Sequence, residues 1–300
     1  MAPTTDVIGR NVRRPARRLR HRLTASLLWL ACAWLGSCGG DLSYRSVAEF
    51  SGAVTLGAGF RKVRIELRNG TLGVDIHDAR EVSYAGGVRR AANTADDLTK
   101  IEAVALAFTG AADEQDPSTL VIRAPSLPDG VQGVLAFELG IRLPADIDID
   151  LVVAENGHLT VANRSASSSA VTGRGDLRFI GCHGAIKAKT GRGQIIVDDH
   201  RGDLDITAAI GSMQVFVREP GQRIRLDTGD GTVQCYIPPN AGFVVDARAA
   251  VGRCGSSFGL DVESPTEFSA AMTGARGDAG TKIVLRTGTG HIQLGSKVFD

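Results

Sequence analysis

Residues 172–197 read TGRGDLRFIGCHGAIKAKTGRGQIIV and contain the repeat that decides the fold. The motif Thr-Gly-Arg-Gly begins at Thr172 and again at Thr190, a spacing of 18. After the regularly spaced glycines of this region, apolar residues occupy the second and fourth following positions, which is the alternation of a half-buried β-strand. The apolar pairs are Leu159 and Val161, Leu177 and Phe179, Ile186 and Ala188, Ile195 and Val197, Leu204 and Ile206, and Met213 and Val215. A strand period nested inside a longer fixed repeat predicts a stacked solenoid.

The glycines mark two corners in each repeat. Those that recur at the spacing of 18 are Gly157, Gly175, Gly193 and Gly211, and those midway between are Gly184 and Gly202. The midway glycines lack the preceding threonine, so they belong to a different corner, and two corners imply two strands per coil. Further copies of Thr-Gly-Xaa-Gly end at Gly231 and Gly290, at spacings of 38 and then 59, which approximate two and three coils.

These spacings lead to a definite expectation for the fold. We expect an all-β chain whose core is a parallel β-solenoid with two short strands per coil of about 18–20 residues. The alternative is a sandwich of antiparallel hairpins with glycine-rich turns. The solenoid is favoured because hairpin strands rarely keep so constant a spacing.

The N-terminal segment resembles the leader of a bacterial lipoprotein. Seven arginines at positions 10–22 precede an apolar run at 23–35, and this run is too short for a permanent membrane span. Leu35-Gly36-Ser37-Cys38 resembles the lipobox, in which the cysteine is diacylated and becomes the mature N-terminus. We therefore expect a signal peptide at residues 1–37 and lipidation of Cys38. A plain cleaved secretory signal and an uncleaved anchor are the alternatives.

Removing the leader changes the charge of the chain. The leader holds seven arginines and one acid, which leaves 27 basic and 32 acidic residues and a net charge of −5. With aromatic residues at 5% of the chain, this composition lacks the basic stripe and stacking platforms that nucleic-acid binding uses, so no nucleic-acid partner is expected. By resemblance to such lipoproteins, Gly39 implies the outer membrane, reached through the N-terminal lipid, on its periplasmic side or at the cell surface.

Three cysteines lie beyond the lipid site. Cys235 and Cys254 both occupy inward positions, and their spacing of 19 is about one coil. Their Cα atoms are therefore expected to stack at about the 4.8 Å strand spacing, which is within disulfide range. A disulfide in an oxidising envelope and two separately buried thiols both fit the sequence. Cys182, at a corner, is left over.

The rest of the mature chain is expected to form one elongated domain. A tether at residues 38–58 precedes this domain at 59–300, which carries a small α/β insertion at about 88–135. Within the insertion, Thr94-Ala95-Asp96-Asp97 has the form of a capping box and predicts a short helix.

Three features together resemble the bacterial putative-adhesin family, whose function is unknown. They are the Asn-Gly and Thr-Gly-Xaa-Gly corners leading into alternating strands, the segment Ile141-Arg142-Leu143-Pro144 before the repeat, and the lipobox. The resemblance covers about residues 60–296. It implies a right-handed parallel β-helix at the cell envelope, and it offers no catalytic residues to carry over.

Two motifs admit a functional interpretation with a structural alternative. Arg-Gly-Asp occurs at 174–176, 201–203 and 276–278. Because the first two copies fall on repeat corners, we interpret them as corner residues rather than recognition motifs. The acids at 146, 148 and 150 alternate with apolar residues and lack the turn glycine and distal glutamate of a calcium loop, so a solvated strand face is expected.

The remaining polar candidates are weak. His183 and His200 lie beside the midway corner in successive repeats, and we expect no metal site there. Asp203 and Asp205 are the close outward acid pair of the repeat, which a polysaccharide-processing enzyme would need. Lys187 precedes Asp205 by one repeat period, so a surface ion pair between them is expected.

The sequence thus favours a non-catalytic envelope lipoprotein, either adhesin-like or a structural interaction module. We expect no catalytic residues, no cofactor and no metal. The expected partner is an unknown envelope protein or glycan. The alternative is a β-helix enzyme acting on polysaccharide.

Overall fold

The computed structural model describes residues 42–278 and 280–299, which belong to one compact unit, Leu42–Asp300. The predicted signal peptide and Cys38 lie outside the described residues. The unit is nearly all β, with one large mixed sheet and one short helix, α1 (Ala95–Glu102). The strands are β1 (Tyr44–Thr55), β2 (Lys62–Ile76), β3 (Glu81–Ala92), β4 (Thr109–Ala112), β5 (Thr119–Arg123), β6 (Gly133–Leu143), β7 (Asp148–Asn156), β8 (Leu159–Ala162), β9 (Ser168–Arg174), β10 (Leu177–Ile180), β11 (Ile186–Arg192), β12 (Ile195–Ile210), β13 (Met213–Asp230), β14 (Val233–Ile237), β15 (Phe243–Ser256), β16 (Val262–Glu263), β17 (Ala270–Arg276) and β18 (Thr281–Ser296). No described helix has the length and apolar character needed to cross a membrane.

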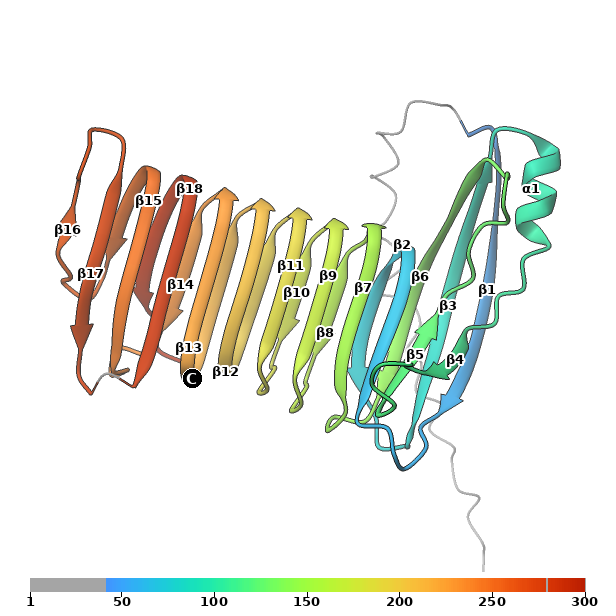
Figure 1. Cartoon of the computed structure of the whole chain (residues 1–300), viewed down its shortest axis with the longest axis horizontal. Helices are drawn as coiled ribbons and strands as arrows, with labels where there is room; N and C mark the ends of the chain where they lie inside the picture. Colours follow the sequence, from blue (N-terminus) through green and yellow to red (C-terminus); the bar gives the residue numbers. More distant parts are fainter. Residues whose placement is uncertain (1–41, 279, 300) are drawn as a thin grey trace, which may run out of the picture. The chain divides into compact units, whose positions relative to one another are not determined.

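The strands of the glycine repeat pair in parallel, one beside the next (Figure 1). Leu177 of β10 lies between Leu159 of β8 and Ile195 of β12, its equivalents in the preceding and following repeats. In the same way Ile186 of β11 lies between Ser168 of β9 and Leu204 of β12. The register predicted from the glycines is therefore confirmed for these strands.

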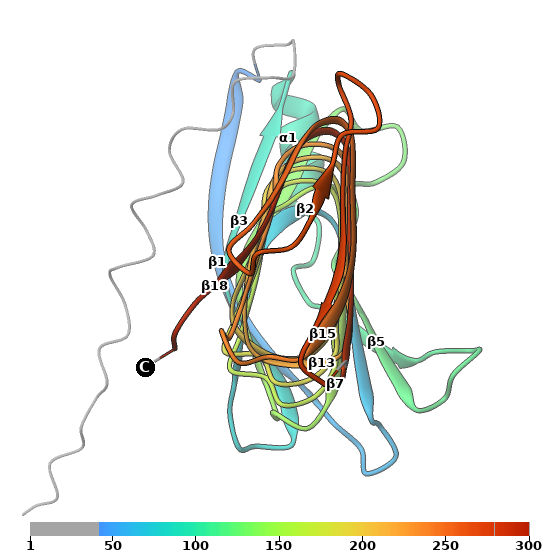
Figure 2. The ribbon, with the colours of Figure 1, turned by 90° about the vertical axis from the view of Figure 1, so that its left-hand side faces the viewer.

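These parallel strands form two layers that face each other (Figure 2). The predicted inward side chains fill the space between the layers, from Leu159 at 1% exposure to Val215 at 0%. Every apolar pair named above is buried, so the alternation of inward and outward side chains is also confirmed. Burial on this scale, roughly 1.5–3 kcal/mol for each large apolar side chain, is what holds the layers together.

One corner of the repeat is built from backbone in close contact. At Gly175, φ is +136°, and a Cβ atom there would lie 2.0 Å from the carbonyl oxygen of Gly157. Only glycine allows so close an approach at a positive φ. The threonine of the motif points inward, and the Oγ1 of Thr172 donates to the same Gly157 oxygen at 3.2 Å. Thr-Gly-Xaa-Gly therefore encodes a corner that bonds to the corner before it.

The N-terminal end of the unit departs from the parallel pattern. β3 pairs antiparallel with both β1 and β6, and β4 pairs antiparallel with β5. Residues 44–55, which were expected to belong to a tether, instead form β1, because Phe50 joins an aromatic cluster with Tyr84, Phe108 and Phe137.

The predicted short helix is present beside these strands. Thr94 caps it by accepting the N–H of Asp97 at 3.0 Å. Ile101 of α1 is fully buried. The segment expected as a small α/β insertion thus holds α1, β4 and β5.

The C-terminal end differs from the expected order of strands. β18 lies between β14 and β15, because Cys235 of β14 pairs with Leu294 and Cys254 of β15 pairs with Ile292. The corner at Gly290 therefore follows Gly231, and the expectation that the spacings count successive coils is wrong here. After β15, the chain forms β16 and β17, which pair antiparallel with each other, and β17 also pairs antiparallel with β15. The chain then comes back to the parallel array as β18.

Candidate functional site

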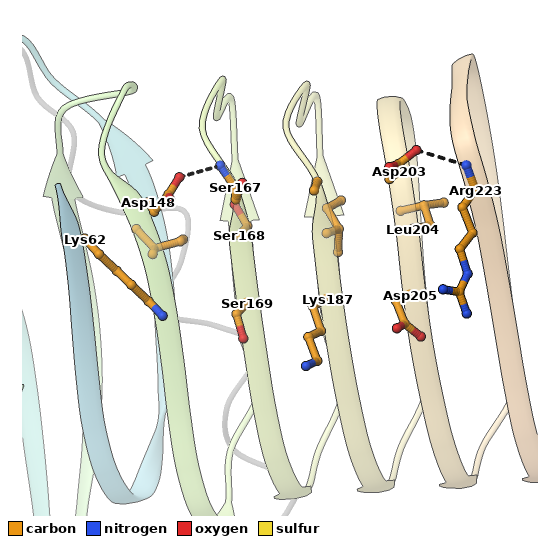
Figure 3. A pocket seen from close by; sticks show the side chains of 13 residues that line it. Lys62, Asp148, Ser167, Ser168, Ser169, Lys187, Asp203, Leu204, Asp205 and Arg223 are labelled. Carbon is orange, nitrogen blue, oxygen red and sulfur yellow. Dashed lines mark hydrogen bonds between the residues drawn. The ribbon is translucent and has the colours of Figure 1, made fainter. Parts of the chain in front are cut away.

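The candidate site is a shallow depression of about 310 Å³ where several parallel strands begin (Figure 3). It runs along β2, β7, β9, β11, β12 and β13 in turn. Polar side chains at its surface are Lys62, Asp148, Ser167, Ser169, Lys187, Asp203, Asp205 and Arg223. The parallel register brings these residues together, although the first and last of them are far apart in the sequence.

Two of the acids in the depression bond to the backbone of the next strand. Asp148 Oδ1 accepts the N–H of Ser167 at 2.9 Å, and Asp203 Oδ1 accepts the N–H of Arg223 at 3.0 Å. Figure 3 shows both bonds at equivalent corners. One oxygen of each carboxylate is thus committed to holding neighbouring strands together, which is a structural role.

The β2 side of the depression is a charge network. Asp150 accepts from Arg64 Nε at 3.0 Å and lies 3.6 Å from Lys62 Nζ. Arg64 also reaches Asp113 at 3.0 Å. The hydrogen bond that Arg64 donates to Asp150 is the main cause that raises the pKa of Arg64. The charged groups on this side are therefore paired with one another.

The middle of the depression is less constrained. Lys187 and Asp205 are neighbours in the register of β11 and β12, as predicted. Among the described residues their side chains form no ion pair, so the expected surface pair is not made. Ser168, which lines the floor, is 2% exposed and its Oγ is buried without a hydrogen-bond partner among the described residues. This arrangement offers an ammonium and a carboxylate to a ligand.

The other sequence candidates have structural roles. In the first Arg-Gly-Asp motif, Asp176 Oδ1 accepts the N–H of Gln194 at 2.7 Å, so this acid also joins neighbouring strands. Asp203, which belongs to the second motif, does the same. Asp146 is exposed in the turn before β7, whereas Asp148 and Asp150 on the strand are half-buried and bonded, so the expected solvated strand face is not formed.

The two histidines lie on different sides of their corner. His200 is fully buried and its Nδ1 lies 2.8 Å from the carbonyl oxygen of Cys182, whereas His183 is exposed. Burial is the main cause that lowers the pKa of His200. Among residues 42–278 and 280–299, no group of three or more histidines, cysteines or acids is placed to hold a metal.

The cysteines do not have the expected neighbours. β18 separates Cys235 from Cys254, so the adjacency on which a disulfide depended is absent, and both thiols are free. Burial raises the pKa of Cys235 to about 12, which makes its thiolate inaccessible at neutral pH. Cys182 is also free and buried.

Sequence reasoning missed a buried polar column at the midway corner. Arg164 is 0% exposed and donates to the carbonyl oxygens of Pro144 at 2.6 Å and of Ile147. Burial lowers its pKa. Arg164, Cys182 and His200 follow one another at the repeat spacing of 18, and all three are buried. That spacing was the signal available in the sequence, because inward corner positions recur with the repeat.

Comparison with known proteins finds similar solved structures but no matching family. No family model matches the chain, and no curated protein matches it. Among solved structures, the fold is similar to that of a putative cell adhesion protein from Clostridium sporogenes, with 15% sequence identity and a TM-score of 0.39, covering 84% of this chain and all of the other. A putative adhesin from Bacteroides fragilis has 9% identity and a TM-score of 0.32, with 84% and 97% of the two chains covered.

Proposed function

We propose that this chain is a non-catalytic interaction module of the bacterial envelope, adhesin-like and anchored by a lipid on Cys38. The observation that carries the proposal is the depression across the parallel strands. It presents Lys187 and Asp205 to solvent-borne ligands. A broad, shallow surface with a few convergent polar groups suits a polymeric partner better than a small substrate.

The proposal includes an architecture for the repeat. The regular parallel registers and the two facing layers support a right-handed β-helix with two strands per coil. In such an array, equivalent outward side chains of neighbouring strands lie about 4.8 Å apart. A glycan or an extended protein segment running along the array would meet these groups at a regular spacing.

The acids that hydrogen-bond to the backbone of a neighbouring strand, Asp148 and Asp203, favour a binding function over hydrolysis. A glycosidase needs two carboxyl groups, one of which donates a proton. Asp203 has one oxygen bonded to the Arg223 N–H, so this acid serves to join neighbouring strands. The alternative, a β-helix enzyme acting on polysaccharide, would have to take its proton from Asp205 beside that committed acid.

Binding can be tested on the full chain with a panel of immobilised envelope polysaccharides and with outer-membrane vesicles. Lys187→Ala and Asp205→Ala each remove one polar group from the depression. Each is expected to weaken binding about five-fold, which corresponds to roughly 1 kcal/mol for one hydrogen bond. Lys189→Ala is the matched control, because Lys189 is exposed on the same strand but does not line the depression.

The same samples distinguish the alternative. Equal binding by all variants would reject the depression as the binding surface. Release of reducing sugar from any polysaccharide, lost in Asp203→Ala or Asp205→Ala, would replace the binding module with an enzyme.

The anchor is tested separately. Cys38→Ala is expected to move the chain from the membrane fraction to the soluble fraction, because a lipid chain buried in the bilayer supplies the membrane affinity. Unchanged fractionation would reject the lipid anchor. The outer membrane, on its periplasmic side or at the cell surface, is the proposed location.

A further inference from the structure

The described sheet has one long, unprotected edge. β1 pairs only with β3 among the described residues, over its whole length from Tyr44 to Thr55 and without a bulge. The C-terminal end is different, because its outer strand, β16, spans only Val262 and Glu263. Proteins commonly protect edge strands by shortening them or by adding proline, lysine or a bulge. β1 is long and has no proline, lysine or bulge, and its two charged side chains, Arg45 and Glu49, are of opposite sign.

The side chains of β1 divide cleanly between its two faces. Val47 is 72% exposed, and Arg45 and Glu49 are exposed on the same face. Phe50, on the other face, packs 5.9 Å from Phe137, measured between ring centroids. Figure 2 shows β1 as the strand outside β3. The free edge therefore has one solvated face and one face continuous with the core.

We propose that β1 pairs with β1 of a second copy of this chain, antiparallel about a two-fold axis through Val47. The sequence of β1 is self-complementary about this point. Arg45 comes opposite Glu49 of the second copy, Glu49 comes opposite its Arg45, and the two Val47 side chains meet at the axis. An interface of this kind is closed, because the same surface is used by both copies.

Charge selects this register over its neighbours. An axis through Arg45 would set the two arginines opposite each other, and an axis through Glu49 would set the two glutamates opposite each other. Like charges directly opposite are destabilising in a sheet, whereas opposite charges and β-branched pairs stabilise it. The register centred on Val47 is the one that places both charges against their opposites.

The buried face of β1 fits the same register. Tyr44 is an exposed aromatic at 44%, and it comes opposite Phe50 of the second copy. Pairing therefore covers Tyr44 and extends the aromatic cluster of one copy across the axis. Neither the ligand of the depression nor the lipid anchor is needed for this association.

Cross-linking tests the proposal in the full chain. With Val47→Cys, the two introduced cysteines face each other across the axis. Their Cα atoms are expected to lie about 4.5–5.5 Å apart, which is within disulfide range. Under mild oxidation we expect most of the chain to run as a dimer on a non-reducing gel. Ala53→Cys, on the same exposed face of β1 but away from the axis, should give at most the background of the unmodified chain. Equal cross-linking at both positions, or none at Val47, would overturn the proposal.

A charge swap tests the register. Glu49→Arg in the Val47→Cys background sets arginine against arginine, and we expect cross-linking to fall at least five-fold. Adding Arg45→Glu reverses both charges and should restore it. Failure of this double variant to recover would reject the pairing of Arg45 with Glu49, provided that thermal melting shows all variants folded.

Discussion

At the level of single residues, the threonines of the repeated motif explain why it recurs. Thr190 Oγ1 donates to the Gly175 oxygen at 3.1 Å, and Thr287 Oγ1 donates to the Gly231 oxygen at 2.8 Å. Each threonine thus satisfies a carbonyl of the neighbouring corner from inside the core. Where the motif is degenerate, Ala208 occupies the inward position and is 2% exposed. The corner therefore tolerates loss of the hydroxyl.

His200 makes stability depend on pH. Its ring is fully buried, and its Nε2 has no hydrogen-bond partner among the described residues. Burial lowers its pKa below the ordinary 6.5, and the nearby His183 lowers it further. The unfolded chain therefore takes up the proton first, so stability is full above about pH 6.5 and falls as the pH drops from there toward the folded pKa.

Urea unfolding between pH 8 and pH 5 measures this effect. We expect the unmodified chain to lose stability below about pH 6.5, and His200→Leu to lose less over the same interval. His291→Ala is the control, since that residue is exposed and its removal leaves both His200 and His183 in place. An identical slope for His200→Leu and the unmodified chain would show that another group causes the pH dependence.

At the level of elements, β12 shows how one strand serves both layers. It runs from Ile195 to Ile210, and its register shifts near Asp199, where φ is +52°. After the bend the alternation resumes, with Leu204 at 1% exposure and Asp203 exposed. The midway glycine in the sequence indicated this bend, but not that the two predicted strands would join into one.

The two faces of β12 are expected to respond differently to substitution. Leu204→Asp places a carboxylate between Ile186 and Ile224, so we expect a loss of several kcal/mol and unfolding of the array. Asp203→Asn keeps an oxygen that can accept the Arg223 N–H, so its melting temperature should change little. Thermal melting followed by circular dichroism compares them, and similar shifts for both would contradict the inward and outward assignment.

At the level of the whole molecule, the sequence predicted local pattern better than strand order. Apolar alternation identified the core from Leu159 to Val215, and the spacing of glycines identified the parallel register. The sequence did not reveal that Gly290 lies against Gly231. All corners have the same local motif, so the motif does not identify the corner that each one contacts. β1 was missed because its alternate residues are small or polar, which gives a weak apolar period.

The candidate site was only partly predictable. Asp203, Asp205 and Lys187 were singled out from their outward positions, and the parallel register does bring them together. The hydrogen bonds that commit Asp148 and Asp203 depend on corner geometry, which the repeat alone does not specify. The buried, unpaired hydroxyl of Ser168 could not be predicted. In the sequence, a serine at an inward position looks like an ordinary replacement of a small apolar residue.

The position of β18 makes the C-terminus essential for the fold. β18 pairs with β13, β14 and β15, so a chain ending at residue 280 would leave each of these strands without one of its partners beside an apolar interior. We expect this truncation to abolish protection of β13 and β14 in amide hydrogen exchange. Removal of residues 298–300 should leave that protection intact. Normal protection in the longer truncation would contradict the placement of β18.

The corner at Gly175 and Thr190 also bears on how such a chain can change its length. The corners at Thr172 and Thr190 each contact the preceding corner through a glycine carbonyl and a threonine hydroxyl. An in-frame duplication of residues 175–192 would therefore create a new interface identical to the existing one and leave the others unchanged. An insertion that is not a whole coil would disrupt the register of the neighbouring strands, so the array can change its length by whole coils without altering the interfaces already present.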